Sequence, residues 1–119
     1  MPAINRQSAA EMLTEERCHI REIINSDDDP AVSIARARVE PGVTTAWHAV
    51  LNTVERFIIL QGSGAVFIGD APAEAVNAGD TVHIAAGVKQ RMKNTGAVDL
   101  IFDCICTPRF AWQNYQSLD

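Results

Sequence analysis

The alternation of apolar and polar residues changes its period near residue 17. Before that point, Met12 and Leu13 follow a stretch in which Ser8 and Glu11 have the spacing of a helical capping box. This pattern predicts a short N-terminal helix of about two turns. From residue 17 onward, apolar residues recur at every second position, which is typical of half-buried strands. The chain after the N-terminal segment is therefore predicted to be all-β.

The segments with the two-residue period are short and are separated by turn signals. The clearest strands are predicted over residues 17–25, 32–40, 55–61, 65–69, 81–87, 90–94 and 99–107. Each connection contains glycine, proline or aspartate, at residues 27–30, 41–42, 62–64, 70–72, 79–80 and 95–97. Because no helical crossover interrupts the strands, the pattern predicts an antiparallel barrel or a double-sheet jelly roll.

Length, composition and charge narrow the class of protein. The 119 residues fit one compact domain over residues 1–119, with 47% apolar and 21% charged residues, close to the globular average. The net charge is −5 and the basic residues are scattered, which argues against nucleic acid as a partner. Since no signal peptide or long apolar run is present, we expect a cytoplasmic protein that does not contact membranes.

The three cysteines give an odd count, and two of them lie on one predicted strand. Cys104 and Cys106 are two residues apart, so their Cα atoms should be roughly 6.6 Å apart on the same face. That separation is at the far edge of what a disulfide tolerates. We expect all three, including Cys18, to be free thiols in a reducing compartment, with Cys104 and Cys106 as packing residues.

One carboxylate interrupts an otherwise apolar strand face. The two-residue period over residues 55–61 places Glu55 on the same face as Phe57 and Ile59. Because an unpaired buried charge costs several kcal/mol, Glu55 needs a partner. His48 is the nearest candidate in the sequence, and Gln90 begins a later strand after the turn at Gly87.

Two spaced motifs resemble those of the cupin superfamily. The first motif of that superfamily is matched in spacing by Gly42, His48, Val50, Glu55 and Gly62. The second is matched by Gly79, Ala85, Gly87, Gln90 and Asn94. The resemblance covers about residues 30–110, and it implies a cupin jelly-roll barrel preceded by a helix and strand extension over residues 7–26.

The resemblance also implies a metal site. Members of the superfamily usually bind a divalent metal through two histidines and a glutamate of the first motif and a histidine of the second. Here His48 and Glu55 are kept, while Val50 and Gln90 stand at the other two positions. The implied ligands are His48, Glu55 and Gln90, for a divalent ion such as Zn, Ni, Mn or Fe. His48 and Gln90 as hydrogen-bonded pocket residues, and Glu55 as the partner of His48 or Arg91, remain alternatives.

The last strand is similar to that of small cupins that process unsaturated uronates. In those enzymes an aspartate and, six residues later, an arginine line the active site. Asp103 and Arg109 have this spacing, so the resemblance implies that Asp103 shuttles a proton and Arg109 holds a substrate carboxylate. If Asp103 faces inward, Cys104 and Cys106 face the other layer. An exposed Asp103 with Arg109 in a surface ion pair is the alternative.

Two classes of function follow from these residues. The first is a metal-dependent isomerase or lyase that acts on a polar, sugar-acid-like metabolite, with the metal as a Lewis acid. The second is a ligand-binding or vestigial cupin that has lost its metal. A dioxygenase is a further alternative, less favoured because redox iron commonly needs more imidazole ligands. Outward residues such as Ile58 and Leu60 are apolar, which predicts a homodimer.

Overall fold

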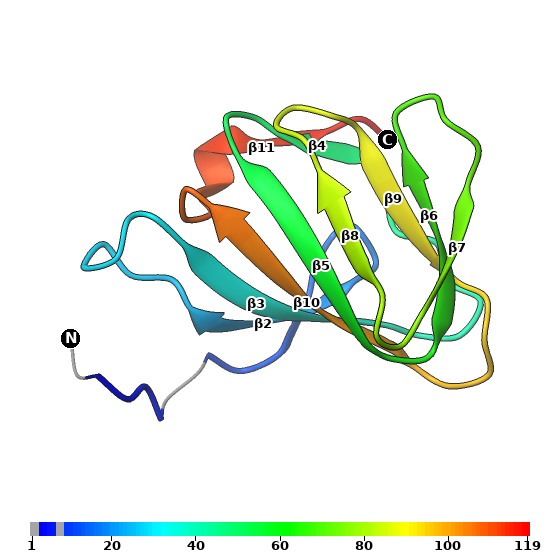
Figure 1. Cartoon of the computed structure of the whole chain (residues 1–119), viewed down its shortest axis with the longest axis horizontal. Helices are drawn as coiled ribbons and strands as arrows, with labels where there is room; N and C mark the ends of the chain where they lie inside the picture. Colours follow the sequence, from blue (N-terminus) through cyan, green and yellow to red (C-terminus); the bar gives the residue numbers. More distant parts are fainter. Residues whose placement is uncertain (1–2, 7–8) are drawn as a thin grey trace.

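The computed structural model describes residues 3–6 and 9–119 and shows two antiparallel sheets that face each other (Figure 1). The larger sheet has the order β1-β2-β3-β10-β5-β8, with strands Met12–Leu13, His19–Ile24, Ser33–Val39, Leu100–Thr107, Val54–Gln61 and Thr81–Ile84. The smaller sheet has the order β11-β4-β9-β6-β7, with strands Tyr115–Ser117, His48–Val50, Gln90–Asn94, Ser63–Ile68 and Glu74–Asn77. The predicted all-β jelly roll is confirmed.

The N-terminal helix is a wrong prediction. Residues 9–16 contain no helix, and Met12–Leu13 instead forms the edge strand β1, which pairs with His19 and Ile20 of β2. Ser8, the expected helix cap, lies outside the described residues. Helix formation needs a costly nucleus, and so short a segment provides little propagation to offset it. Pairing with β2 satisfies the same backbone groups in the sheet ladder.

Every second residue of the central strands enters one apolar core. On β10 the inward residues begin with Leu100 and Phe102, and the ring of Phe102 packs on Phe57 of β5 with centroids 4.9 Å apart. Val39, Ile59 and Leu100 are at most 1% exposed. We call this tightly packed part, formed by Val39, Ile59, Met92 and Leu100, the closed end of the barrel.

A glycine turn and a buried asparagine complete the closed end. Gly62, between β5 and β6, has a φ of +89°, and a Cβ there would lie 2.9 Å from the carbonyl oxygen of Asp99. A larger residue would therefore strain the turn. Asn94 is 1% exposed, and its amide nitrogen donates to the carbonyls of Val39 and Val98 at 2.8 Å each. These bonds close the barrel where the strands end.

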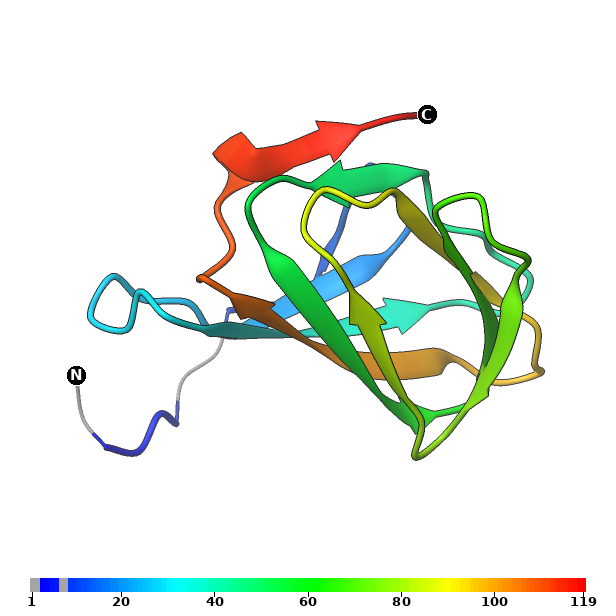
Figure 2. The ribbon, with the colours of Figure 1, turned by 45° about the horizontal axis from the view of Figure 1, so that its top comes forward.

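The C-terminal tail crosses the opposite end of the barrel. After β10 the chain forms the short 3₁₀ helix Trp112–Asn114 and then β11, which pairs with β4 (Figure 2). Phe110, Trp112 and Tyr115 are thereby carried to the mouth of the barrel. We call this part of the barrel the open end. Among the described residues, no helix is long and apolar enough to cross a membrane.

The outer face of β5 carries apolar side chains. Ile58 is 37% and Leu60 is 43% exposed, on the face opposite Phe57 and Ile59. The predicted alternation along this strand is therefore confirmed. The homodimer inferred from it stays a prediction.

Candidate functional site

Glu55 lies inside the barrel at the open end. Its side chain is held on β5 between β8 and β10, and the residue is only 6% exposed. The amide nitrogen of Gln90, on β9 of the facing sheet, donates to Oε1 of Glu55. The thiol of Cys104 donates to Oε2, with 3.0 Å between sulfur and oxygen. A carboxylate that would be costly to bury alone is therefore bonded from both sheets.

Cys104 and Cys106 face into the barrel, so the prediction that they face the other layer is wrong. Both sulfur atoms approach Oε2 of Glu55, that of Cys106 at 3.9 Å, and the two sulfurs are 3.7 Å apart. All three cysteines are free thiols, as predicted. The physical reason for the orientation is the strand period: Leu100 and Phe102 enter the core, and Cys104 and Cys106 continue that phase.

Glu55, Cys104 and Cys106 form a group that could hold a metal ion. One potential ligand atom from each lies within 4.8 Å of the other two. The hydrogen bond with Cys106, together with burial, raises the pKa of the Cys104 thiol above its usual range. Thiols must lose their protons to bind a metal, so binding here would release protons. Two sulfurs and a carboxylate are a donor set suited to zinc and other thiophilic ions.

The imidazole of His48 contacts a second carboxylate, that of Glu16, rather than Glu55. Its Nδ1 is 2.9 Å from the carbonyl oxygen of Ala46 and 3.3 Å from Oε2 of Glu16. The hydroxyl of Tyr115 donates to the same Glu16 oxygen at 3.2 Å, and its ring stacks on His48 with centroids 5.4 Å apart. Burial raises the pKa of the Glu16 carboxyl, while the charge of His48 and the Tyr115 hydroxyl oppose the rise.

The three metal ligands implied by the resemblance are close in the fold but do not all converge. His48 and Gln90 are register partners on β4 and β9, and Gln90 contacts Glu55. The amide hydrogen of Gln90, rather than its oxygen, is directed at Glu55. Val50 is 3% exposed and lines the cavity with an apolar side chain. Glu55 alone is shared between the predicted ligands and the group with the two cysteines.

Asp103 does not face the barrel interior, so its predicted inward orientation is wrong. Its carboxylate accepts two hydrogen bonds from Arg36, at 2.8 and 3.1 Å, on the outer face of the larger sheet. Arg109 is also directed elsewhere, with its Nε donating to Oδ1 of Asn25 at 2.6 Å. Asp103 precedes Cys104 on β10, and neighbouring strand residues point to opposite faces. Neither predicted catalytic residue lines the cavity described next.

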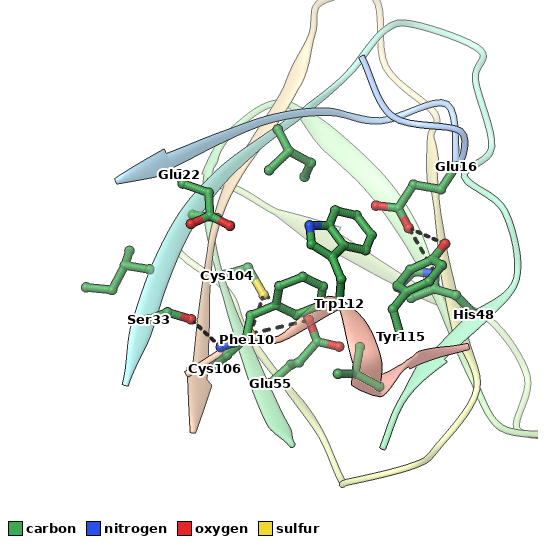
Figure 3. A pocket seen from close by; sticks show the side chains of 14 residues that line it. Glu16, Glu22, Ser33, His48, Glu55, Cys104, Cys106, Phe110, Trp112 and Tyr115 are labelled. Carbon is green, nitrogen blue, oxygen red and sulfur yellow. Dashed lines mark hydrogen bonds and ion pairs between the residues drawn. The ribbon is translucent and has the colours of Figure 1, made fainter. Parts of the chain in front are cut away.

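A cavity of about 90 Å³ opens at this end of the barrel, several times the space that one water molecule needs. In Figure 3 Cys104 and Cys106 lie on one side of the view, and Glu16, His48 and Tyr115 lie on the other. Phe110 and Trp112 are seen between these two groups. An inner cavity of about 60 Å³ shares Glu16, His48, Glu55 and Cys104. The cavity of about 90 Å³ is lined by Glu16, Ile20, Glu22, Ser33, Ile34, Ala35, His48, Val50, Glu55, Cys104, Cys106, Phe110, Trp112 and Tyr115.

Glu16 and the two cysteines line the cavity although the sequence pattern did not predict them as site residues. Leu100, Phe102 and the cysteines form an unbroken apolar series along β10, a signal that could have placed the thiols inside. Glu16 carries no such signal, because it lies in a charged loop before β2. That loop is drawn inside by long-range contacts, such as the hydrogen bond from the backbone N–H of Ala46 to the Glu16 carbonyl at 2.9 Å.

Comparison with known proteins finds one relative among curated sequences and many similar structures. An uncharacterised protein of Methanocaldococcus jannaschii is 28% identical over 109 residues, which cover 90% of this chain and 86% of that protein. A structure of a predicted oxalate decarboxylase from Thermotoga maritima matches with a TM-score of 0.69 and 22% identity, over 76% of this chain and 80% of that chain. At these identities the structural likeness shows the fold.

A third match is Pac13 of Streptomyces, described as a nucleoside dehydratase. It has a TM-score of 0.77 and 13% identity, over 92% of this chain and 84% of that chain. The family model described as "Cupin domain" matches residues 35–107, which include every strand from the middle of β3 to the end of β10. Together with the two-sheet barrel, this match shows that the chain belongs to the cupin family.

Proposed function

We propose that this chain is a metal-dependent isomerase or lyase that acts on a small, polar, oxygenated metabolite at the open end of the barrel. The observation that carries the proposal is the convergence of Glu55, Cys104 and Cys106 on one point of the cavity wall. The structural matches to a predicted oxalate decarboxylase and a nucleoside dehydratase support the proposal. Both names denote enzymes that break a bond of the substrate and do not insert oxygen into it.

The proposed metal ligands are Glu55, Cys104 and Cys106. The donor set fits a thiophilic ion, so zinc is the first choice among the divalent ions expected for the family. When bound, such an ion supplies Lewis-acid polarisation of a carbonyl or hydroxyl oxygen. The Gln90 amide holds Glu55 in place from the facing sheet, as outer-shell hydrogen bonds commonly do for metal ligands.

The proton-transfer group that we propose is His48, in place of Asp103. Its ring is held by the carbonyl of Ala46 and the carboxylate of Glu16, and it is stacked on Tyr115. An imidazole oriented by a buried carboxylate can accept a proton from a substrate carbon or oxygen and return it to a neighbouring atom. Holding the ring on two sides fixes its position relative to the cavity.

A binding module without catalysis is the second candidate. One observation favours it: Oε1 and Oε2 of Glu55 already accept hydrogen bonds from Gln90 and Cys104, so the buried carboxylate is satisfied without a metal. In that case the cavity would hold a ligand and leave it unchanged. The two candidates differ in whether metal loading produces turnover.

The test combines metal loading with a search for proton exchange. Protein purified without a histidine tag is analysed for metals, loaded with zinc, and incubated in deuterated water with a panel of hydroxy and keto compounds. We expect zinc-dependent deuterium incorporation or elimination that is lost in His48→Ala and in a Cys104→Ser/Cys106→Ser double variant. Zinc binding with no exchange or turnover across the panel would favour the binding module.

A further inference from the structure

The cavity at the open end is lined by three carboxylates and by one basic side chain, the imidazole of His48. Its lining includes the carboxylates of Glu16, Glu22 and Glu55, and among the described residues no lysine or arginine lines it. The nearest predicted clamp for an anion, Arg109, is bonded to Asn25. In the zinc-free protein, a negatively charged ligand would therefore find no lysine or arginine to replace its water, which is costly for a charge entering a partly buried site.

The three carboxylates are not equally engaged. Glu16 is bonded to His48 and Tyr115, and Glu55 to Gln90 and Cys104. The carboxylate of Glu22, on β2, accepts one long hydrogen bond from Nδ2 of Asn25, at 3.5 Å. Among the described residues, no ion pair involves Glu22. Glu22 is therefore the carboxylate with the most capacity left for a ligand.

Asn25 fixes Glu22 beside the aromatic tail. The same Nδ2 of Asn25 donates to the backbone carbonyl of Phe110 at 3.0 Å, while Oδ1 accepts from Arg109. The backbone N–H of Phe110 donates to the hydroxyl of Ser33 at 2.8 Å, which anchors the start of the tail to β3. Figure 3 shows Glu22 and Phe110 on the wall of the same cavity. A carboxylate and an aromatic wall are thus held near each other.

The aromatic wall consists of rings set at steep angles. Phe110 and Trp112 have centroids 5.0 Å apart and planes at 84°, and Trp112 and Tyr115 have centroids 5.3 Å apart and planes at 63°. Each aromatic ring carries a negative charge density on its faces, so a wall built of such rings can attract positive charge. Trp112 is 59% exposed although it lines the cavity. An exposed tryptophan at a cavity mouth is available to cover a ligand.

We infer that this cavity binds a small organic cation, an amine or quaternary ammonium compound, with Trp112 and Phe110 on its apolar sides and Glu22 as its counter-ion. Aromatic corners backed by carboxylates are the usual environment for such groups, because the ring quadrupole and the carboxylate both attract positive charge. The inference deepens the proposed function, since it gives the metabolite in the same cavity a positive charge. It replaces the sugar acid suggested by the spacing of Asp103 and Arg109.

The test uses choline as the probe, with zinc-free protein and calorimetry or NMR shifts. Its neutral isostere, in which carbon replaces the nitrogen, isolates the charge, and galacturonate is the anionic comparison. We expect saturable binding of choline, at least about tenfold weaker binding of the isostere, and no binding of galacturonate. Equal affinity for choline and its isostere, or preferred binding of galacturonate, would overturn the inference.

Matched variants test the two contacts. Trp112→Ala and Glu22→Gln should each weaken choline binding about tenfold, while Glu74→Gln, an exposed glutamate on β7, should leave it unchanged. Wild-type affinity in both cavity variants would contradict the assignment, and their thermal unfolding reports that each is folded. The Cys104→Ser/Cys106→Ser variant separates the proposals. In this variant we expect zinc binding to be lost and choline binding to be kept. In the wild-type protein, zinc binding without choline binding would overturn this inference alone, and choline binding without zinc binding would overturn the metal proposal alone.

Discussion

The closed and open ends of the barrel are built by the same strands, but one end is filled and the other holds a cavity. Strands β5, β9 and β10 each contribute an apolar residue to the closed end, namely Ile59, Met92 and Leu100. Two residues along β9 and four residues along β5 and β10, the inward residues of the open end are Gln90, Glu55 and Cys104. The backbone pattern is shared, so the difference between the ends lies in side-chain chemistry.

The two ends of the barrel differ in what burial requires of their side chains. At the closed end burial removes apolar surface from water, which is the main stabilising term of folding. At the open end each buried polar atom must be bonded, and Glu55 meets this need with donors from both sheets. Substitutions at the closed end should therefore change stability alone, while substitutions at the open end should change binding as well.

The largest expected effect is that of Leu100→Ala. Leu100 is fully buried, so its truncation should leave a cavity and lower the free energy of unfolding by about 3 kcal/mol. Urea denaturation measures the change, and Leu118→Ala, at a 45% exposed site, is the control. Zinc affinity of the folded fraction should be unchanged. A loss of zinc binding in folded Leu100→Ala protein would show that the two ends are not independent.

A smaller effect is expected for Gln90→Leu. The substitution removes the donor to Oε1 of Glu55 and leaves a buried carboxylate oxygen without it, which should cost about 2 kcal/mol of stability. Exposed Gln116→Leu on β11 serves as the control. Because Gln90 supports Glu55 and is not itself a proposed ligand, zinc binding should persist with lower affinity. Complete loss of zinc from folded protein would instead make Gln90 a ligand, as the resemblance implies.

The smallest effect is expected for Asp103→Asn. The Asp103 carboxylate pairs with Arg36, whose side chain is 39% exposed, and such pairs contribute about 1 kcal/mol or less. A double-mutant cycle with Arg36→Gln measures the coupling between the two side chains. Zinc and choline binding should match those of the wild type. A change in either would indicate that the outer face of β10 communicates with the cavity.

The strands could be predicted because the two-residue period and the glycine turns are local signals. The inward set Glu55, Phe57 and Ile59 on β5 follows directly from that period. The orientation of β10 could not be read as safely, since Ile101 and Ile105 on its outer face are as apolar as the cysteines on its inner face. On β10 the spacing of Asp103 and Arg109 favoured an inward Asp103, which is the wrong face of the strand.

The partners of His48 depend on contacts between distant segments. Glu16 precedes His48 by many residues and reaches it through backbone bonds between the N-terminal loop and residue 46. Tyr115 arrives from the C-terminal tail through the pairing of β11 with β4. No local sequence pattern predicts either contact. The sequence therefore indicated only Glu55 as a carboxylate partner of His48. Side chains supplied by both ends of the chain complete the open end.

A cobalt(II) titration tests whether the metal ligands are Glu55, Cys104 and Cys106. Thiolate ligands to cobalt produce a strong charge-transfer absorption that carboxylate, amide and imidazole ligands do not. We expect binding of one cobalt per chain with this absorption, which should be retained in His48→Ala and lost in the Cys104→Ser/Cys106→Ser variant. Cobalt binding without thiolate absorption that is abolished by His48→Ala would contradict this expectation and place the metal at the ligands implied by the cupin motifs.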